Sequence, residues 1–332
     1  MSAVVSRDKE PSTQGDKGEQ RATPGVADMA QTARKQCTSA TALQLRQRQM
    51  RSGGWAHFGS SQESIEATCM SLLGLSPDRE PASAVEFLFN SQLANGAWPA
   101  FRGDTEGSWT TSLALSTIIV TNHTSEACQS ALKWLLAEKG EEGHWLWRWK
   151  FKTVDRNVRF DPDKYGWPWN HGAGSWVIPT AFSVIAIKQY TVCARREASE
   201  ARIRLGVEML LDRACVDGGW NSGNSVVYGV PLRPHVEATA IALLALQDER
   251  RNEVVDKSLL WLRQRAATVG SASSLAWTIL SLFTYREPIQ QLQDRLADII
   301  GDGAGIRNNA TLAVVLLALR CGEMIHPFMV FR

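Results

Sequence analysis

Two glutamates stand in similar short segments that lie far apart in the chain. Glu66 belongs to the segment SIEATC, and Glu237 belongs to HVEATA. A carboxyl group can donate a proton, accept one, or bind a cation. A free glutamic acid has a pKa of about 4.3, so either residue would need burial in an apolar site to hold a proton at neutral pH. The alternative interpretation is that both glutamates complement helix N-termini.

Tryptophans are the second set of residues whose type suggests chemistry. Trp109, Trp176 and Trp277 stand at or near the starts of apolar segments and could line a cavity, where aromatic faces stabilise cations. Trp167 and Trp169 lie in a long insertion and could form a lid or a ligand platform. Core packing is the alternative for Trp109, Trp176 and Trp277.

These residues recur within an internal repeat. Residues 84–114 read as a helix, a Gly-x-Trp turn and the start of a second helix, with Gln92, Gly96 and Trp98 at fixed spacing. Three further turns have a similar spacing and end at Trp55, Trp145 and Trp220. A hydroxyl residue recurs in the helix after each turn: Thr68, Ser112, Thr180, Thr239, Thr278 and Thr311. Six copies in phase predict a repeat of helical hairpins.

The two helices of each hairpin differ in their surface pattern. The second helix is apolar nearly all round, as in ALSTIIV and ATLAVVLLAL, so it should be buried. The first helix is amphipathic and should be outer. We therefore expect an all-α fold, a closed double ring of about six hairpins, with an open solenoid as the alternative. Gly96 should end a helix, the tryptophan N–H should find a partner, and Gln92 could bond backbone groups of a neighbouring helix terminus.

The segment Phe87-Leu88, Gln92 and Gly96-Ala97-Trp98 resembles the QW motif of triterpene cyclases. The whole pattern, over residues 38–320, resembles the prenyltransferase/squalene-oxidase repeat of the α/α-toroid superfamily, which includes terpenoid cyclases of the squalene-hopene type. The resemblance implies an α/α toroid. Members of this superfamily have different activities, so function must come from the site.

The segment from His235 to Ala240 is similar to two cyclase motifs. Class II terpene cyclases that protonate an alkene carry Asp-x-Asp-Asp-Thr-Ala, and oxidosqualene cyclases carry Asp-Cys-Thr-Ala. The resemblance places Glu237 on the proton-donating aspartate, while His235 and Ala238 replace the other two aspartates of the longer motif. Glu66 would then be a second polar anchor or a terminating base. His235 is a candidate substrate-binding residue on another face of the helix.

The resemblance favours a terpenoid-cyclase-like protein that takes a hydrophobic isoprenoid into the ring and cyclises it after protonation. One alternative is a non-catalytic module that binds an isoprenoid or a peptide. Another is a partner subunit whose toroid completes the active site of another protein.

Several chemistries lack their motifs. No Asp-x-Cys with a later inner-helix histidine suggests zinc, and His326 in the tail is the nearest late histidine. There is no DDxxD motif, no thioester sequence and no P-loop, so we expect no metal and no cofactor. The formal net charge is +2, which gives no argument for nucleic acid.

The ends of the chain and its cysteines suggest its organisation. Residues 1–35 are polar and without period, so we expect a disordered arm before a single toroid domain over residues 36–332. The apolar, basic tail could dock on the ring or touch a membrane surface. No apolar run appears long enough to span a membrane, and the six cysteines are scattered, so we expect a reduced, cytoplasmic protein.

Overall fold

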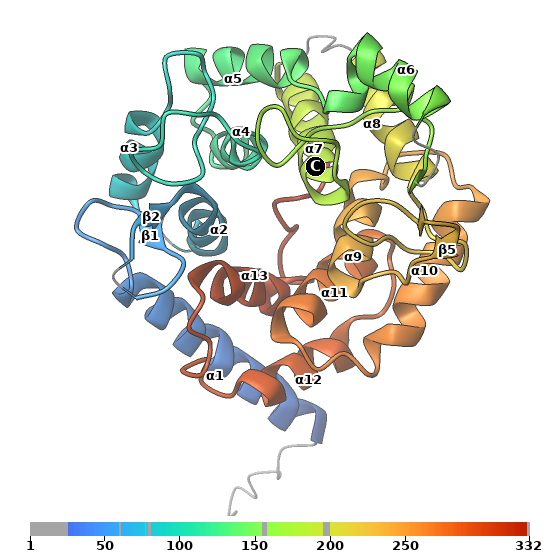
Figure 1. Ribbon diagram of the computed structural model, residues 1–332. Helices are drawn as coiled ribbons and strands as arrows, with labels where there is room; N and C mark the ends of the chain where they lie inside the picture. Colours follow the sequence, from blue (N-terminus) through green and yellow to red (C-terminus); the bar gives the residue numbers. More distant parts are fainter. Residues whose placement is uncertain are drawn as a thin grey trace, which may run out of the picture.

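The chain folds into two concentric rings of helices (Figure 1). The computed structural model describes residues 26–59, 61–76, 78, 81–154, 158–194 and 200–330. Within these residues the inner ring holds α2 (Ile65–Leu75), α4 (Thr110–Val120), α7 (Val177–Ala194), α9 (Val236–Ala245), α11 (Ala272–Thr284) and α13 (Asn309–Arg320). The outer ring holds α1 (Val26–Gln47), α3 (Ala82–Asn90), α5 (Glu126–Ala137), α8 (Glu200–Asp212), α10 (Glu253–Ala266) and α12 (Gln290–Ile300).

The inner ring is closed. Each inner helix packs on the next, and α13 packs on both α11 and α2, so the last hairpin meets the first (Figure 1). The side chain of Asn309 donates a hydrogen bond to the carbonyl of Ala56 at 2.8 Å across this junction. The α/α toroid expected from the sequence is confirmed, and the open solenoid is not what forms.

Four turn tryptophans connect an outer helix to the inner helix that follows it. The indole N–H of Trp98 donates to the Leu88 carbonyl at 2.7 Å, and its backbone N–H donates to Thr111 Oγ1 at 2.9 Å. The same pair of bonds recurs at Trp55 (Leu45 and Thr68), Trp167 (Leu135 and Thr180) and Trp220 (Leu210 and Thr239). Each buried indole therefore has the partner that it needs.

The glutamine and glycine of the turn act as the sequence suggests. Gln92 donates from its amide to the carbonyl of Gly96 and to that of Ala127 in the first turn of α5, both at 2.9 Å. Gly96 has φ of 89°, a conformation that favours glycine.

Two predicted repeat positions are wrong. In the second repeat the bonding hydroxyl belongs to Thr111, not Ser112, which instead donates to the Trp109 carbonyl. In the third repeat the turn tryptophan is Trp167, whereas Trp145 is 76% exposed. The intervening insertion displaced the tryptophan along the chain, which broke the fixed spacing.

The insertion contains three tryptophans at alternate positions, Trp145, Trp147 and Trp149, and they lie in a helix. Trp145–Thr153 forms α6 after the short 3-10 helix η1 (Glu141–Gly143). Short strands occur elsewhere: β1 (Trp55–Ala56) pairs antiparallel with β2 (Glu63–Ser64). A three-stranded sheet at the rim joins β3 (Val158–Arg159), β4 (Val226–Val227) and β5 (Val230–Pro231) in that order.

Two features bear on the expected organisation. Helix α1 begins at Val26, inside the segment 1–35 expected to be disordered, and residues 1–25 lie outside the described residues. Helix α7 is long and apolar enough to cross a membrane by length and composition, but 72% of it is buried as part of the inner ring. This helix corrects the expectation that no apolar run is long enough to span a membrane.

The C-terminal segment, residues 322–330, folds back across the ring at the carboxyl ends of the inner helices, where Figure 1 shows the red trace near the centre. Of the two fates considered for the tail, docking on the ring is the one observed.

Candidate active site

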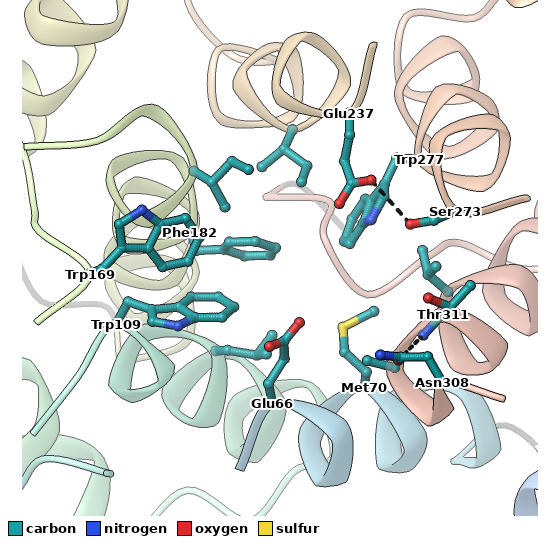
Figure 2. Close-up of a pocket in the computed structure, with 15 residues that line it drawn as sticks. Glu66, Met70, Trp109, Trp169, Phe182, Glu237, Ser273, Trp277, Asn308 and Thr311 are labelled. Carbon is teal, nitrogen blue, oxygen red and sulfur yellow. Dashed lines mark hydrogen bonds between the residues drawn. The ribbon is translucent and has the colours of Figure 1, made fainter. Parts of the chain in front are cut away.

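A cavity of about 200 Å³ lies in the ring at the amino-terminal ends of the inner helices (Figure 2). Its walls have two layers. The upper layer comes from the starts of the six inner helices in the described chain and consists of Glu66, Trp109, Ile178, Glu237, Ser273 and Ala310. The lower layer lies four residues further along each helix and consists of Met70, Leu113, Phe182, Ile241, Trp277 and Val314.

The two layers follow from helix geometry, because residues i and i+4 lie one above the other on the same face. The upper layer contains both glutamates and a serine, whereas the lower layer is entirely apolar. Trp169, Asn308 and Thr311 complete the wall. The cavity therefore has polar groups on two sides of its upper layer, and its lower layer is apolar.

Glu66 is the carboxyl that most readily holds a proton. Its side chain points into the cavity and is 35% exposed there (Figure 2). Burial within the ring, and then the negative charge of Glu237, raise the pKa of Glu66 to about 7. Glu66 therefore holds a proton near neutral pH more readily than an ordinary glutamate does.

His57 is the nearest basic group to Glu66. Its Nε2 lies 3.5 Å from Glu66 Oε2 and 2.9 Å from Ser64 Oγ. Burial lowers the pKa of His57, so the imidazole is neutral at pH 7. A neutral imidazole does not hold Glu66 in its ionised form, as an imidazolium would.

Glu237 faces Glu66 from the other side of the cavity (Figure 2). Burial raises the pKa of Glu237, but Ser273 Oγ donates a hydrogen bond to Glu237 Oε2 at 3.1 Å and opposes that rise. The two carboxyls thus have different environments, and Glu237 is the one with a donor to its ionised form. The different environments suit one carboxyl to donate a proton and the other to accept one.

Aromatic rings form a continuous wall from the upper to the lower layer. Trp169 packs edge-on against Trp109, with ring centroids 5.1 Å apart. Trp109 lies 5.5 Å from Phe182, which lies 5.8 Å from Trp277. Figure 2 shows this group beside the carboxyls. Their faces can stabilise a positive charge inside the cavity.

The structure separates the expected site residues into two groups. Glu66, Glu237, Trp109, Trp169 and Trp277 line the central cavity. The other three candidates lie elsewhere and are Trp167, Trp176 and His235.

Each of the three has a physical reason to be outside. Trp167 is buried and donates to the Leu135 carbonyl as a turn tryptophan. Trp176, 39% exposed, and His235 line a separate rim hollow of about 640 Å³. They stand two residues before the upper-layer residues Ile178 and Glu237, so their side chains lie on a different side from the face that turns into the ring.

Sequence reasoning missed Phe182, Met70, Ser273 and Asn308 as cavity residues. The repeat holds a signal for the first two. Two residues before the correctly aligned threonines stand Glu66, Trp109, Ile178 and Glu237, and four residues after these stand Met70, Leu113, Phe182 and Ile241. The alignment on Ser112 concealed this by putting Thr110 in the place of Trp109.

No family model and no curated protein sequence matches this chain. Solved structures do resemble it. A variant of the type II terpene cyclase MstE from Scytonema, in complex with its substrate geranylgeranyl dihydroxybenzoate, has a TM-score of 0.56 and 16% identity over 85% of this chain and 81% of that chain. A protein from Actinoplanes has a TM-score of 0.60 and 16% identity, over 88% of this chain and 100% of that chain. A GH76 α-mannanase from Bacteroides thetaiotaomicron has a TM-score of 0.56 and 11% identity, over 89% of this chain and 95% of that chain.

These likenesses establish the class of fold: the chain is a terpenoid-cyclase-like α/α toroid. Because the same toroid also carries a mannanase, the fold does not select one reaction. The residues inside the ring must decide that question.

Proposed function

We propose that this protein binds a hydrophobic isoprenoid chain in the central cavity and cyclises it by proton transfer. The proposal is carried by the position of Glu66, whose carboxyl faces an apolar, aromatic cavity with a second carboxyl opposite. Burial, and then the charge of Glu237, raise the pKa of Glu66 to about 7, which favours the protonated form. The proposal agrees in fold with a type II terpene cyclase whose bound substrate carries a geranylgeranyl chain.

The roles of the two glutamates are the reverse of those expected from the motif. Glu66 gives its proton to one carbon of a terminal alkene, which forms a C–H bond and leaves a cation on the more substituted carbon. The faces of Trp109, Phe182 and Trp277 stabilise that cation while a second alkene attacks it and forms the ring bond. The Glu237 carboxylate accepts the final proton, so the substrate is isomerised without net gain or loss of atoms.

The raised pKa has a consequence for rate. It keeps the acid form abundant at pH 7, but it also makes Glu66 a weaker acid than an unperturbed glutamic acid. We therefore expect slow protonation of the alkene. Alkenes that give a tertiary cation should react best, because that cation is the more stable one.

The test is a cyclisation assay in D2O. Purified protein is incubated with farnesyl, geranylgeranyl and squalene-type substrates in mild detergent, and extracts are analysed by mass spectrometry. A cyclic product should gain one deuterium because the initiating proton comes from an exchangeable carboxyl. Glu66→Gln should abolish the product, whereas Glu86→Gln, on the exposed face of α3, should not.

A product that forms equally in Glu66→Gln would contradict the assignment of the acid. Retention of substrate without any product would favour the non-catalytic isoprenoid-binding alternative. The partner-subunit alternative predicts product only when a second protein is added. A cytoplasmic location remains a prediction of the sequence.

A glycosidase is the second candidate, because two carboxyls of different pKa across a cavity also suit glycoside hydrolysis and a mannanase shares the fold. The lower layer opposes it, since six apolar side chains offer no partners to sugar hydroxyls. Release of sugar from mannan oligosaccharides, lost in Glu66→Gln, would decide for the glycosidase.

A further inference from the structure

Beneath the lower layer of the central cavity lies part of the C-terminal segment, which we call the floor. Phe328, in the C-terminal segment, is completely buried. Its ring centroid lies 5.7 Å from that of Phe182 and 5.1 Å from that of Trp277, two residues of the lower layer. The aromatic wall of the cavity therefore continues onto a residue that no inner helix supplies.

Two inner-ring glutamines hold this segment in place. The amide of Gln189 donates to the carbonyls of Pro327 at 2.7 Å and Met329 at 3.1 Å. Gln247 donates to the Phe328 carbonyl at 2.9 Å and accepts from the Val330 N–H at 3.0 Å. Four bonds to consecutive backbone groups fix the position of the ring of Phe328.

Histidine 326 anchors the same segment from the other side. His326 Nε2 lies 2.7 Å from Thr284 Oγ1, and its Nδ1 accepts from the Phe328 N–H at 3.3 Å. Burial lowers the pKa of His326 to about 3, so it stays neutral and the segment carries no buried charge.

A second hollow lies beyond this floor. It has a volume of about 440 Å³ and is mostly apolar, with walls that include Leu73, Leu317, His326 and Pro327. Leu73 and Leu317 each stand three residues after a lower-layer residue on the same helix, so this lower hollow continues in the direction of the central cavity. Residues 326–328 stand between the two.

The size of the central cavity limits what it can enclose. A dry cavity of about 150 Å³ accommodates benzene, so six carbons need about that volume. At about 200 Å³ the central cavity holds roughly eight carbons, between one and two isoprene units. A longer chain must leave through the mouth or displace the floor.

We propose that Phe328 sets the length of the apolar chain that the toroid encloses, with the C-terminal segment as the floor of the cavity. Replacement of its ring by a methyl group joins the central cavity to the lower hollow. The ligand class, an isoprenoid, rests on the proposed function. The depth of the cavity does not depend on that function and can be tested separately.

Cavity depth can be measured with saturated probes that cannot react. Linear alcohols from hexan-1-ol to tetradecan-1-ol are titrated calorimetrically into the full chain, into Phe328→Ala and into Phe328→Leu. For the natural protein we expect affinity to rise with chain length to about eight carbons and then level. In Phe328→Ala it should rise further, by about fourfold for each additional buried CH2.

Phe87→Ala is the matched control, because Phe87 is a buried phenylalanine of α3 that does not line the cavity. It should leave the length limit unchanged. The same limit in the natural protein and Phe328→Ala, or an equal gain in Phe87→Ala, would overturn the floor. So would the lack of saturable binding of any alcohol. Phe328→Leu gives an intermediate limit if Phe328→Ala does not fold.

The floor and the proposed function can fail separately. A limit that moves in Phe328→Ala, with no substrate cyclised in the D2O assay, supports the floor and rejects the cyclase. A cyclic product with an unmoved limit supports the cyclase and rejects the floor.

Discussion

At the scale of the residue, Glu66 and Glu237 show how one motif position acquires two chemical states. Each stands two residues before a threonine. Burial, and then the negative charge of Glu237, raise the pKa of Glu66, whereas Ser273 donates to Glu237 and opposes the rise in its pKa. The ordinary pKa of glutamate therefore does not describe either residue, and the difference between them is the basis of the proposed chemistry.

The titration of Glu66 can be observed directly. Carbon-13 NMR of the labelled side-chain carboxyl should show a midpoint at about pH 7. Glu237→Gln removes a negative charge, so the midpoint should move to lower pH but stay above 4.5, because burial remains the larger cause. A midpoint near 4.5 in the natural protein would remove Glu66 as the proton donor.

Stability should carry the same signature. Because folding raises the pKa of Glu66 from 4.5 to about 7, the folded protein binds more protons in that interval and loses stability as pH rises through it. Glu66→Gln should therefore stabilise the protein at pH 8, by about 1 kcal/mol after allowance for solvent screening, and have little effect at pH 4. Urea denaturation at the two pH values measures this, and Glu86→Gln should show no such difference.

Part of the site was readable from the sequence. Glu66 and Glu237 share one position of the repeat, which the toroid turns toward the ring axis. Trp109 and Trp277 were predicted because they stand at or near the starts of apolar segments. The roles of the carboxyls were not readable, since burial and the charge opposite depend on the assembled ring. Phe328 could not be foreseen, because no periodicity connects a tail residue to the lower layer.

At the scale of the element, the hairpin is held by the turn tryptophan rather than by the turn alone. One indole bonds the outer helix behind it and its own backbone bonds the inner helix ahead. This explains why four copies keep the residue even where the intervening chain lengthens, as it does before Trp167.

Trp98→Phe tests that role. It removes the donor to the Leu88 carbonyl and leaves a small void, so we expect a loss of about 2 kcal/mol in the free energy of unfolding. Trp145→Phe is the matched control, since Trp145 is exposed and starts α6. Equal losses in the two variants, measured by chemical denaturation, would contradict the structural assignment.

The repeat pattern predicts the inner helices but not the turn that follows an insertion. The apolar second helices predicted the inner ring correctly, because a helix that is buried on all sides carries apolar residues on all its faces. The third repeat failed because spacing was carried through an insertion that contains η1 and α6. A tryptophan–threonine separation of 13 residues, as at Trp55 and Trp98, would have selected Trp167.

At the scale of the whole molecule, closure makes every inner helix depend on two neighbours. An open solenoid can lose a terminal repeat and keep the rest folded. Here α13 covers α2, so removal of the last hairpin exposes buried residues at the opposite end of the chain.

A chain that ends at Arg286 should therefore lose cooperative unfolding altogether. It lacks α12, α13 and the C-terminal segment, which leaves α2 and α11 without their shared neighbour. Thermal unfolding followed by circular dichroism should show a broad, shallow change where the full chain gives a sharp one. A sharp transition in the shortened chain would mean that the hairpins fold independently.

The packing of α13 on α2 has a consequence for synthesis on the ribosome. Arg320 donates to the carbonyl of Gly74 at 2.8 Å, across 246 positions of sequence. Ribosomes add about 5–20 residues per second, so α2 waits on the order of 10–50 s for the helix that covers it. During that interval its apolar face is available to chaperones and to other nascent chains. The time needed to translate the chain between α2 and α13, rather than the stability of the first hairpin, governs how long that exposure lasts.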